Sequence, residues 1–285
     1  MGAGNPWLQR RVLSYAHQGG AWAWPSSTLF AMRNALKMGA DALELDVHRT
    51  VDGHIVICHD ATVDRTTDGT GAICDLTLAQ VRALDAAYWF AGGADVTMGL
   101  GDHEYPYRGR AGSENEFKIA TLAEVLETFP KTILNIDIKT PGAQSTEAVE
   151  TVARLLEDFG RADDVIVTSF DDAVTASFHE RAPHVPTSAG VGGTTLFVQA
   201  LTTGDAPPSL DAVALQVPER YGSVVVVDRR LVDAAHTSSL AVHVWTVNDV
   251  ESMGRLVELG VDGIITDLPE ELSGVLEAMG ARWMP

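Results

Sequence analysis

The sequence ALELDVHRTVDGHIVICHD, residues 42–60, holds two short apolar runs joined by an Asp-Gly turn signal. Alternation along the first run predicts a strand that carries Glu44 and Asp46 on the same face. The same spacing along the second run places His59 at the end of the next predicted strand. Two carboxylates on one face repel each other, and burying them together raises at least one pKa, a cost that a bound cation removes. This stretch alone is compatible with a metal site and with a solvated edge strand.

The composition limits the class of protein. The chain has 285 residues, 46% of them hydrophobic, which is enough for a sizeable core in one large domain or two ordinary ones. Its 20 Lys and Arg against 39 Asp and Glu give a formal charge of −19, which argues against non-specific binding to nucleic acid or to an anionic membrane. The first 20 residues lack the apolar run of a signal peptide, and no stretch reaches about 18 apolar residues. We therefore expect no transmembrane segment and a cytoplasmic location.

The low cysteine content also agrees with the expected cytoplasmic location. The two cysteines, Cys58 and Cys74, are too few for a disulfide scaffold. Cys58 falls on the strand face opposite His59, so we expect a buried free thiol there.

Apolar runs alternate with helical patterns along most of the chain, which predicts a parallel sheet. The predicted strands cover residues 12–17, 42–47, 54–59, 132–139, 165–170, 187–191, 212–217, 241–247 and 263–267, with a further apolar run at 223–227. The predicted helices cover residues 26–38, with Ser26 and Ser27 as caps, and residues 78–84, 122–129, 146–159, 250–259 and 270–279.

These elements predict a single α/β domain over residues 1–285, with a closed (β/α)8 TIM barrel as the first choice and an open doubly wound sheet as the second. Nine strands compete for eight places, and we expect the surplus strand near residues 212–227. Residues 86–118 have no clear period. We expect a small insertion after the third strand, at about residues 61–118, that packs over the C-terminal face of the barrel.

A barrel fold predicts where the active site lies, because active sites in this fold lie at the C-terminal ends of the strands. Polar side chains gather at these predicted ends: His17, Glu44, Asp46, His59, Asp137, Lys139, Ser169, Trp245, Thr266 and Asp267. In TILNIDIK, alternation allows Asn135, Asp137 and Lys139 to point inward together. Carboxylates, histidines and a lysine at neighbouring strand ends predict one coherent site.

Several ordered segments resemble the glycerophosphodiester phosphodiesterase family, which belongs to the phosphatidylinositol-phospholipase-C-like barrel group. They are AHQGG at 16–20, PSSTLFAMRNALKMGAD at 25–41, ELDVHRTVDGHIVICHD at 44–60 with the DRTTDGTG that follows, LNIDIK at 134–139, VWTVND at 244–249 and DGIITDLP at 262–269. Together these segments span nearly the whole chain.

The resemblance implies a metal-dependent barrel that hydrolyses glycerophosphodiesters to glycerol 3-phosphate and an alcohol. Carried over by position, the metal ligands are Glu44, Asp46 and Asp137, the acid/base pair is His17 and His59, and Lys139 contacts the phosphate. An all-oxygen ligand set favours one divalent cation, Mg²⁺ or Ca²⁺. The residues do not fix which histidine is the base, and Trp245 is either a core residue or a stacking surface for the substrate.

Three departures from the family pattern bear on these roles. Gln18 stands where the family has a phosphate-contacting Arg, so a bidentate donor is lost from the expected substrate-binding set. Ser26 and Ser27 replace a Glu-Asn pair, and Asp137 replaces a Glu. Two alternatives stay open: a lysophospholipase D, favoured if the insertion builds an apolar groove, and a non-catalytic barrel that binds a phosphodiester.

Overall fold

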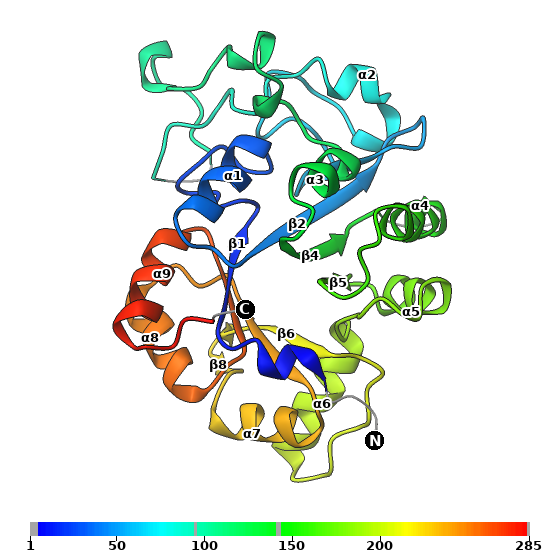
Figure 1. Ribbon diagram of the computed structural model, residues 1–285, viewed down its shortest axis with the longest axis vertical. Helices are drawn as coiled ribbons and strands as arrows, with labels where there is room; N and C mark the ends of the chain where they lie inside the picture. Colours follow the sequence, from blue (N-terminus) through cyan, green and yellow to red (C-terminus); the bar gives the residue numbers. More distant parts are fainter. Residues whose placement is uncertain (1–4, 94–95, 141–143, 284–285) are drawn as a thin grey trace.

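The structure is a computed structural model that describes residues 5–93, 96–140 and 144–283 (Figure 1). Its centre is a curled parallel sheet in the order β5-β4-β2-β1-β10-β9-β6. The bounds of these strands are β1 Leu13–His17, β2 Ala42–Arg49, β4 Ile133–Ile138, β5 Val165–Thr168, β6 Ala214–Pro218, β9 Ala241–Trp245 and β10 Gly263–Thr266. Parallel bridges from Thr187 to Val167 and from Ser188 to Ala214 join the two ends of the sheet. The closed barrel is confirmed, and the open doubly wound sheet is wrong.

The surplus strand is not where the sequence analysis expected it. β3, Ile55–Ile57, pairs antiparallel with β2 and lies outside the ring. The physical reason is the short connection: the turn at Asp52 and Gly53 allows only an antiparallel neighbour, because a parallel pair needs a long crossover. β6 takes a full place in the ring, and the apolar run at 223–227 enters a separate hairpin of β7, Arg220–Tyr221, and β8, Val224–Val225.

Helices surround the ring on its outer side, as Figure 1 shows. They are α1 Leu29–Lys37, α3 Leu122–Thr128, α4 Gln144–Asp158, α5 Asp172–Arg181, α6 Val191–Thr203, α7 Arg229–Thr237, α8 Val250–Leu259 and α9 Pro269–Ala278. A further short helix, α2 Leu78–Val81, lies in the segment after β3. Short 3-10 turns are η1 Pro6–Gln9, η2 Ile73–Asp75, η3 Asp102–Glu104, η4 Arg110–Gly112 and η5 Asn115–Phe117. None of the helices within the described ranges has the length and apolar character needed to cross a bilayer.

Two predicted helix boundaries are wrong. The N-cap of α1 is Thr28, whose hydroxyl accepts the amide of Ala31, and not Ser26 or Ser27. Ser27 has a φ of 61°, whereas a capping residue takes extended backbone angles. α2 ends at Val81, one turn earlier than predicted.

The outer face of the ring is apolar, and its interior has an apolar N-terminal end and a polar C-terminal end. Alternation along β2 sends Leu43, Leu45 and Val47 outward into a core shared with the surrounding helices. Tyr15 and Trp7 help to fill the N-terminal end of the barrel interior. The polar side chains of the strands therefore remain for the C-terminal end.

The described residues of 61–118 take part in small apolar clusters together with residues of α1 and β3. Phe117 packs with Phe30 of α1, and Arg108 lies over the rings of Tyr88 and Tyr105. Cys58 is a buried free cysteine, as expected, and burial raises the pKa of its thiol to about 12. None of the described residues of 61–118 lines the cavity at the C-terminal ends of the strands.

Candidate active site

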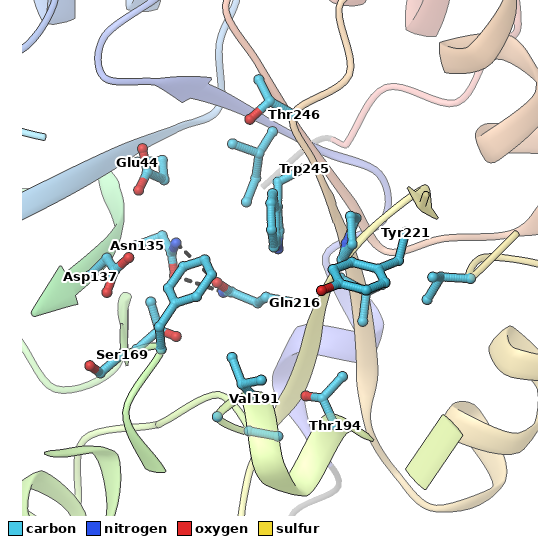
Figure 2. A pocket seen from close by; sticks show the side chains of 18 of the residues that line it. Glu44, Asn135, Asp137, Ser169, Val191, Thr194, Gln216, Tyr221, Trp245 and Thr246 are labelled. Atoms are coloured by element: carbon cyan, nitrogen blue, oxygen red, sulfur yellow. Dashed lines mark hydrogen bonds between the residues drawn. The ribbon is translucent and has the colours of Figure 1, made fainter. Parts of the chain in front are cut away.

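A cavity of about 800 Å³ lies at the C-terminal end of the barrel (Figure 2). Seven of the eight predicted site residues line it: His17, Glu44, Asp46, His59, Asp137, Lys139 and Trp245. The eighth, Gln18, is buried behind His17, and its Nε2 lies 3.2 Å from His17 Nε2. Figure 2 shows Glu44 and Asp137 on one side of the cavity, with Val191, Thr194 and Tyr221 on the other.

Strand register brings the acidic residues and the lysine together. Asp46 of β2 is the direct partner of Asp137 of β4 in the parallel pairing. Lys139 follows Asp137 by two residues and shares its face, so its Nζ lies 3.0 Å from Asp46 Oδ1 and 2.9 Å from Asp137 Oδ2. Burial raises the pKa of Asp137 to about 6 against the opposing effect of Lys139. Burial lowers the pKa of Lys139, but the two carboxylates outweigh it and the net shift is upward.

Glu44 is the third carboxylate of the cavity wall. Burial, with the nearby charge of Asp46, raises the pKa of Glu44 to about 8. Its carboxylate accepts a hydrogen bond from the amide of Gln18, and its Oε2 lies 4.0 Å from His17 Nε2.

His17 has a carboxylate partner that the sequence analysis did not recognise. Its Nδ1 donates to Asp267 Oδ1 over 2.6 Å, and Asn248 in turn donates to Asp267 Oδ2. Burial lowers the pKa of His17, but the Asp267 hydrogen bond and the charge of Glu44 outweigh it and raise the pKa to about 9. The available signal was the position of Asp267 directly after β10, since strand ends face the cavity.

His59 is held in a similar way from the other side. It follows β3, and its Nδ1 donates to Asp60 Oδ1 over 2.7 Å. Arg65 binds both oxygens of Asp60, at 2.6 Å from Nε and 3.2 Å from a terminal nitrogen. The rings of His17 and His59 have their centroids 6.4 Å apart at an interplanar angle of 80°. Each imidazole therefore has an aspartate on Nδ1 and faces the same cavity.

The carboxylates meet the chemical requirement for a cation but do not form a ready site. Asp46 Oδ2 and Asp137 Oδ1 are buried and have no hydrogen-bond partner among the described residues. Unpartnered buried carboxylate oxygens are costly, and they are the ligands that Mg²⁺ and Ca²⁺ prefer. In the described ranges no three His, Cys, Asp or Glu side chains converge on a common centre. The ammonium of Lys139 is the positive charge between Asp46 and Asp137, so a cation bound by both requires Lys139 to move aside.

Neutral side chains line the rest of the cavity. Asn135 and Gln216 exchange two hydrogen bonds across the barrel, at 2.8 Å and 3.3 Å. Trp245 lines the wall and contacts Phe170, with ring centroids 5.6 Å apart. Trp245 therefore lines the cavity and also packs against the apolar cluster in the barrel interior.

A closed (β/α)8 barrel with histidines, carboxylates and a lysine in a cavity at its C-terminal end defines a barrel enzyme. The model of the "Glycerophosphoryl diester phosphodiesterase family" matches residues 17–271. The chain belongs to this family of phosphoric diester hydrolases, and the resemblance inferred from the motifs is confirmed.

Individual relatives agree with this assignment. The chain is 30% identical over 272 residues to a glycerophosphodiester phosphodiesterase of Caldanaerobacter subterraneus, covering 95% of this chain and 100% of the relative. Among solved structures, a glycerophosphoryl diester phosphodiesterase domain from Mycobacterium tuberculosis superposes with a TM-score of 0.77 at 21% identity, over 93% and 98% of the two chains. An Oleispira antarctica phosphodiesterase in complex with the product sn-glycerol-3-phosphate superposes with a TM-score of 0.75 at 23% identity, over 95% and 99%. The last two similarities support the fold.

Proposed function

We propose that this enzyme hydrolyses glycerophosphodiesters to glycerol 3-phosphate and an alcohol. The observation that carries the proposal is the pair of imidazoles, His17 and His59, which face one cavity with ring centroids 6.4 Å apart. The family name and the name of the Caldanaerobacter relative describe the same reaction class.

The two aspartates determine which ring nitrogen of each histidine is free to act on the substrate. Asp267 and Asp60 each accept the Nδ1 proton of one ring, so Nε2 is the nitrogen that each ring offers to the substrate. One histidine accepts the proton of the attacking nucleophile while the other donates a proton to the departing oxygen. Each transfer contributes about 10²- to 10⁴-fold to the rate. A phosphodiester group seated between the rings is also within the field of the Lys139 ammonium.

Glu44, Asp46 and Asp137 would hold one divalent cation, Mg²⁺ or Ca²⁺. The unpartnered oxygens of Asp46 and Asp137 and the hard oxygen character of the set support this part of the proposal. Such an ion supplies electrostatic stabilisation of the charge that develops on the phosphoryl oxygens. Lys139, when it no longer bridges Asp46 and Asp137, provides a donor for the bound phosphate.

Phosphorus NMR of a panel of glycerophosphodiesters, with and without a chelator, tests the reaction. We expect release of glycerol 3-phosphate that depends on Mg²⁺ or Ca²⁺ and falls at least about 10²-fold in His17→Ala. His54→Ala, at an exposed turn position, is the matched histidine control. Unchanged turnover after chelation would remove the cation from the proposal, and full activity of His17→Ala would remove His17.

The alternative to an enzyme is a barrel that binds a phosphodiester without cleaving it. This alternative predicts no turnover of any diester at any metal concentration. The Gln18 departure is its main support. The two aspartate-held imidazoles beside three carboxylates and a lysine favour catalysis instead, since binding alone does not require them. A lysophospholipase D would cleave the same bond between the phosphate and the departing alcohol. The two alternatives differ in which substituents the cavity accepts.

A further inference from the structure

The cavity is divided by charge. Its charged and titratable side chains are His17, Glu44, Asp46, His59, Asp137 and Lys139. They all come from β1, β2, β4 and the turn after β3. The other described lining residues contain no charged side chain, and most of them come from β5, β6, β9, α6, the β7–β8 hairpin and the loops beside these elements. Half of the cavity therefore suits the phosphodiester group, and the other half must suit something neutral.

Six residues of the neutral half form an apolar wall. They are Phe170, Val191, Val198, Tyr221, Val224 and Trp245. The sequence left open an apolar groove built by the insertion at 61–118, but none of the described residues of that insertion lines the cavity. Four of the six come from α6 and the β7–β8 hairpin, Phe170 follows β5, and Trp245 ends β9.

Size and exposure show that a glycerol and a phosphate do not fill this space. A volume of about 800 Å³ is in the range of pockets that enclose drug-sized ligands. Tyr221, Val224 and Phe170 are 78%, 58% and 56% exposed, so the rim of the wall presents large apolar surface to water. A ligand that covers this rim gains free energy in proportion to the apolar area removed from water.

A cationic head group does not match the wall. Quaternary ammonium groups are held against the faces of aromatic rings. The Phe170 ring already has the Lys139 ammonium 5.1 Å from its centroid, which would repel a second cation, and the wall has no carboxylate to neutralise one. A hydrocarbon chain needs no counter-charge.

We propose that the apolar wall binds a hydrocarbon chain carried by the phosphodiester substrate, with Tyr221 and Val224 as specificity-determining residues. This inference rests on the proposed function. The chain has two chemical sources, the departing alcohol or an acyl or alkyl group on the glycerol, and the same wall serves either.

The hairpin offers a matched control. Val224 and Val225 are consecutive residues of β8, 58% and 48% exposed, and successive side chains of a strand point to opposite faces. Val224 lines the cavity and Val225 does not. Val224→Ser and Val225→Ser therefore make the same chemical change at similar exposure, with only one of them inside the cavity. Tyr221→Ser provides a second variant in the wall.

The test measures kcat/KM by release of the alcohol or of the phosphomonoester, below the critical micelle concentration of every substrate. One series lengthens the alcohol of a glycerophosphoalkanol from ethanol to octanol. The other compares glycerophosphocholine with its 1-acyl derivatives of increasing length. In at least one series we expect kcat/KM to rise about twofold to fourfold per buried methylene. Val224→Ser and Tyr221→Ser lower that dependence, whereas Val225→Ser matches the native chain.

The outcomes separate this inference from the function it rests on. A rise in the first series alone assigns the chain to the departing alcohol, and a rise in the second alone assigns it to the glycerol; each supports the inference. Cleavage with no dependence on chain length in either series, or equal effects of Val224→Ser and Val225→Ser, overturns it and leaves the hydrolase intact. No cleavage of any diester, glycerophosphocholine included, overturns the proposed function.

Discussion

Each candidate catalytic histidine is positioned by one aspartate, and the two aspartates are reached in different ways. Asp60 is the next residue after His59, and Arg65 holds it. Asp267 is 250 residues from His17 and reaches it only because β1 and β10 are neighbours in the ring. The orientation of His17 therefore depends on correct closure of the barrel.

Replacing Asp267 tests this dependence. Asp267→Asn removes the charge and allows the wrong tautomer of His17, so we expect kcat/KM for a glycerophosphodiester to fall by about 10²- to 10⁴-fold. In the metal-free protein, the pKa of His17 falls below its value of about 9, as measured by NMR titration of the imidazole. Glu270→Gln, at an exposed position nearby in the chain, is the control. An unchanged His17 pKa in Asp267→Asn would contradict the assigned hydrogen bond.

His243 is a buried histidine that does not line the cavity. It lies on β9 beside Tyr15, and burial lowers its pKa to about 3. Below pH 6.5 the unfolded chain binds a proton at this residue and the folded chain does not. The free energy of unfolding therefore falls as the pH decreases, by up to about 1.4 kcal/mol per pH unit.

His243→Leu removes this contribution. We expect the slope of unfolding free energy against pH, measured by urea titrations between pH 6 and pH 4.5, to decrease by about 1 kcal/mol per pH unit. His54→Leu, in an exposed turn, leaves the slope as it is. The comparison of slopes is independent of any change that the substitution makes at neutral pH. Equal slopes in His243→Leu and the native chain would show that His243 is protonated in the folded state.

At the scale of elements, capping governs where helices begin around the ring. Thr121 and Glu124 at the start of α3 form a reciprocal capping box: Thr121 Oγ1 accepts the amide of Glu124, and Glu124 Oε2 accepts the amide of Thr121. α3 packs next to β3, so the cap stabilises the elements that carry the turn of His59.

Thr121→Ala removes one half of this box. We expect a loss of about 1 kcal/mol in the free energy of unfolding, measured by urea denaturation. Thr121→Ser keeps the hydroxyl and is expected to retain most of the stability. If alanine and serine were equally destabilising, the loss would come from the methyl group and not from the cap.

At the scale of the whole molecule, one buried carboxylate links distant parts of the barrel. Asp262 Oδ2 accepts from the amide of Val242 and from His236, and its Oδ1 lies 2.9 Å from Arg11 Nε. These partners come from β9, α7 and the segment before β1. The side chain of Asp262 is fully buried, so its partners decide whether it stabilises the fold.

We expect Asp262→Ala to lower the free energy of unfolding by about 3 kcal/mol, because it removes the acceptor of the buried Val242 amide and of the partly buried His236 ring. Arg11→Gln costs less than about 1 kcal/mol, since Arg11 is half-exposed and its pair is screened by water. Thermal and urea unfolding of the two variants measure the difference. Similar losses in both would mean that the Arg11 pair, and not the buried hydrogen bonds, carries the contribution of Asp262.

The sequence by itself determined the barrel class, the family and seven of the residues that line the cavity. These follow from local patterns: period-two alternation puts Glu44 and Asp46 on one face of β2, and strand ends in a barrel converge. Only the tertiary structure decided that β3 leaves the ring, that Lys139 lies between Asp46 and Asp137, and that Asp267 holds His17. It also decided that α6 and the β7–β8 hairpin contribute four of the six residues of the apolar wall. The physical reason is that the alternation of polar and apolar residues can be recognised within one segment of the sequence. These contacts instead depend on register and ring closure between segments far apart in the chain.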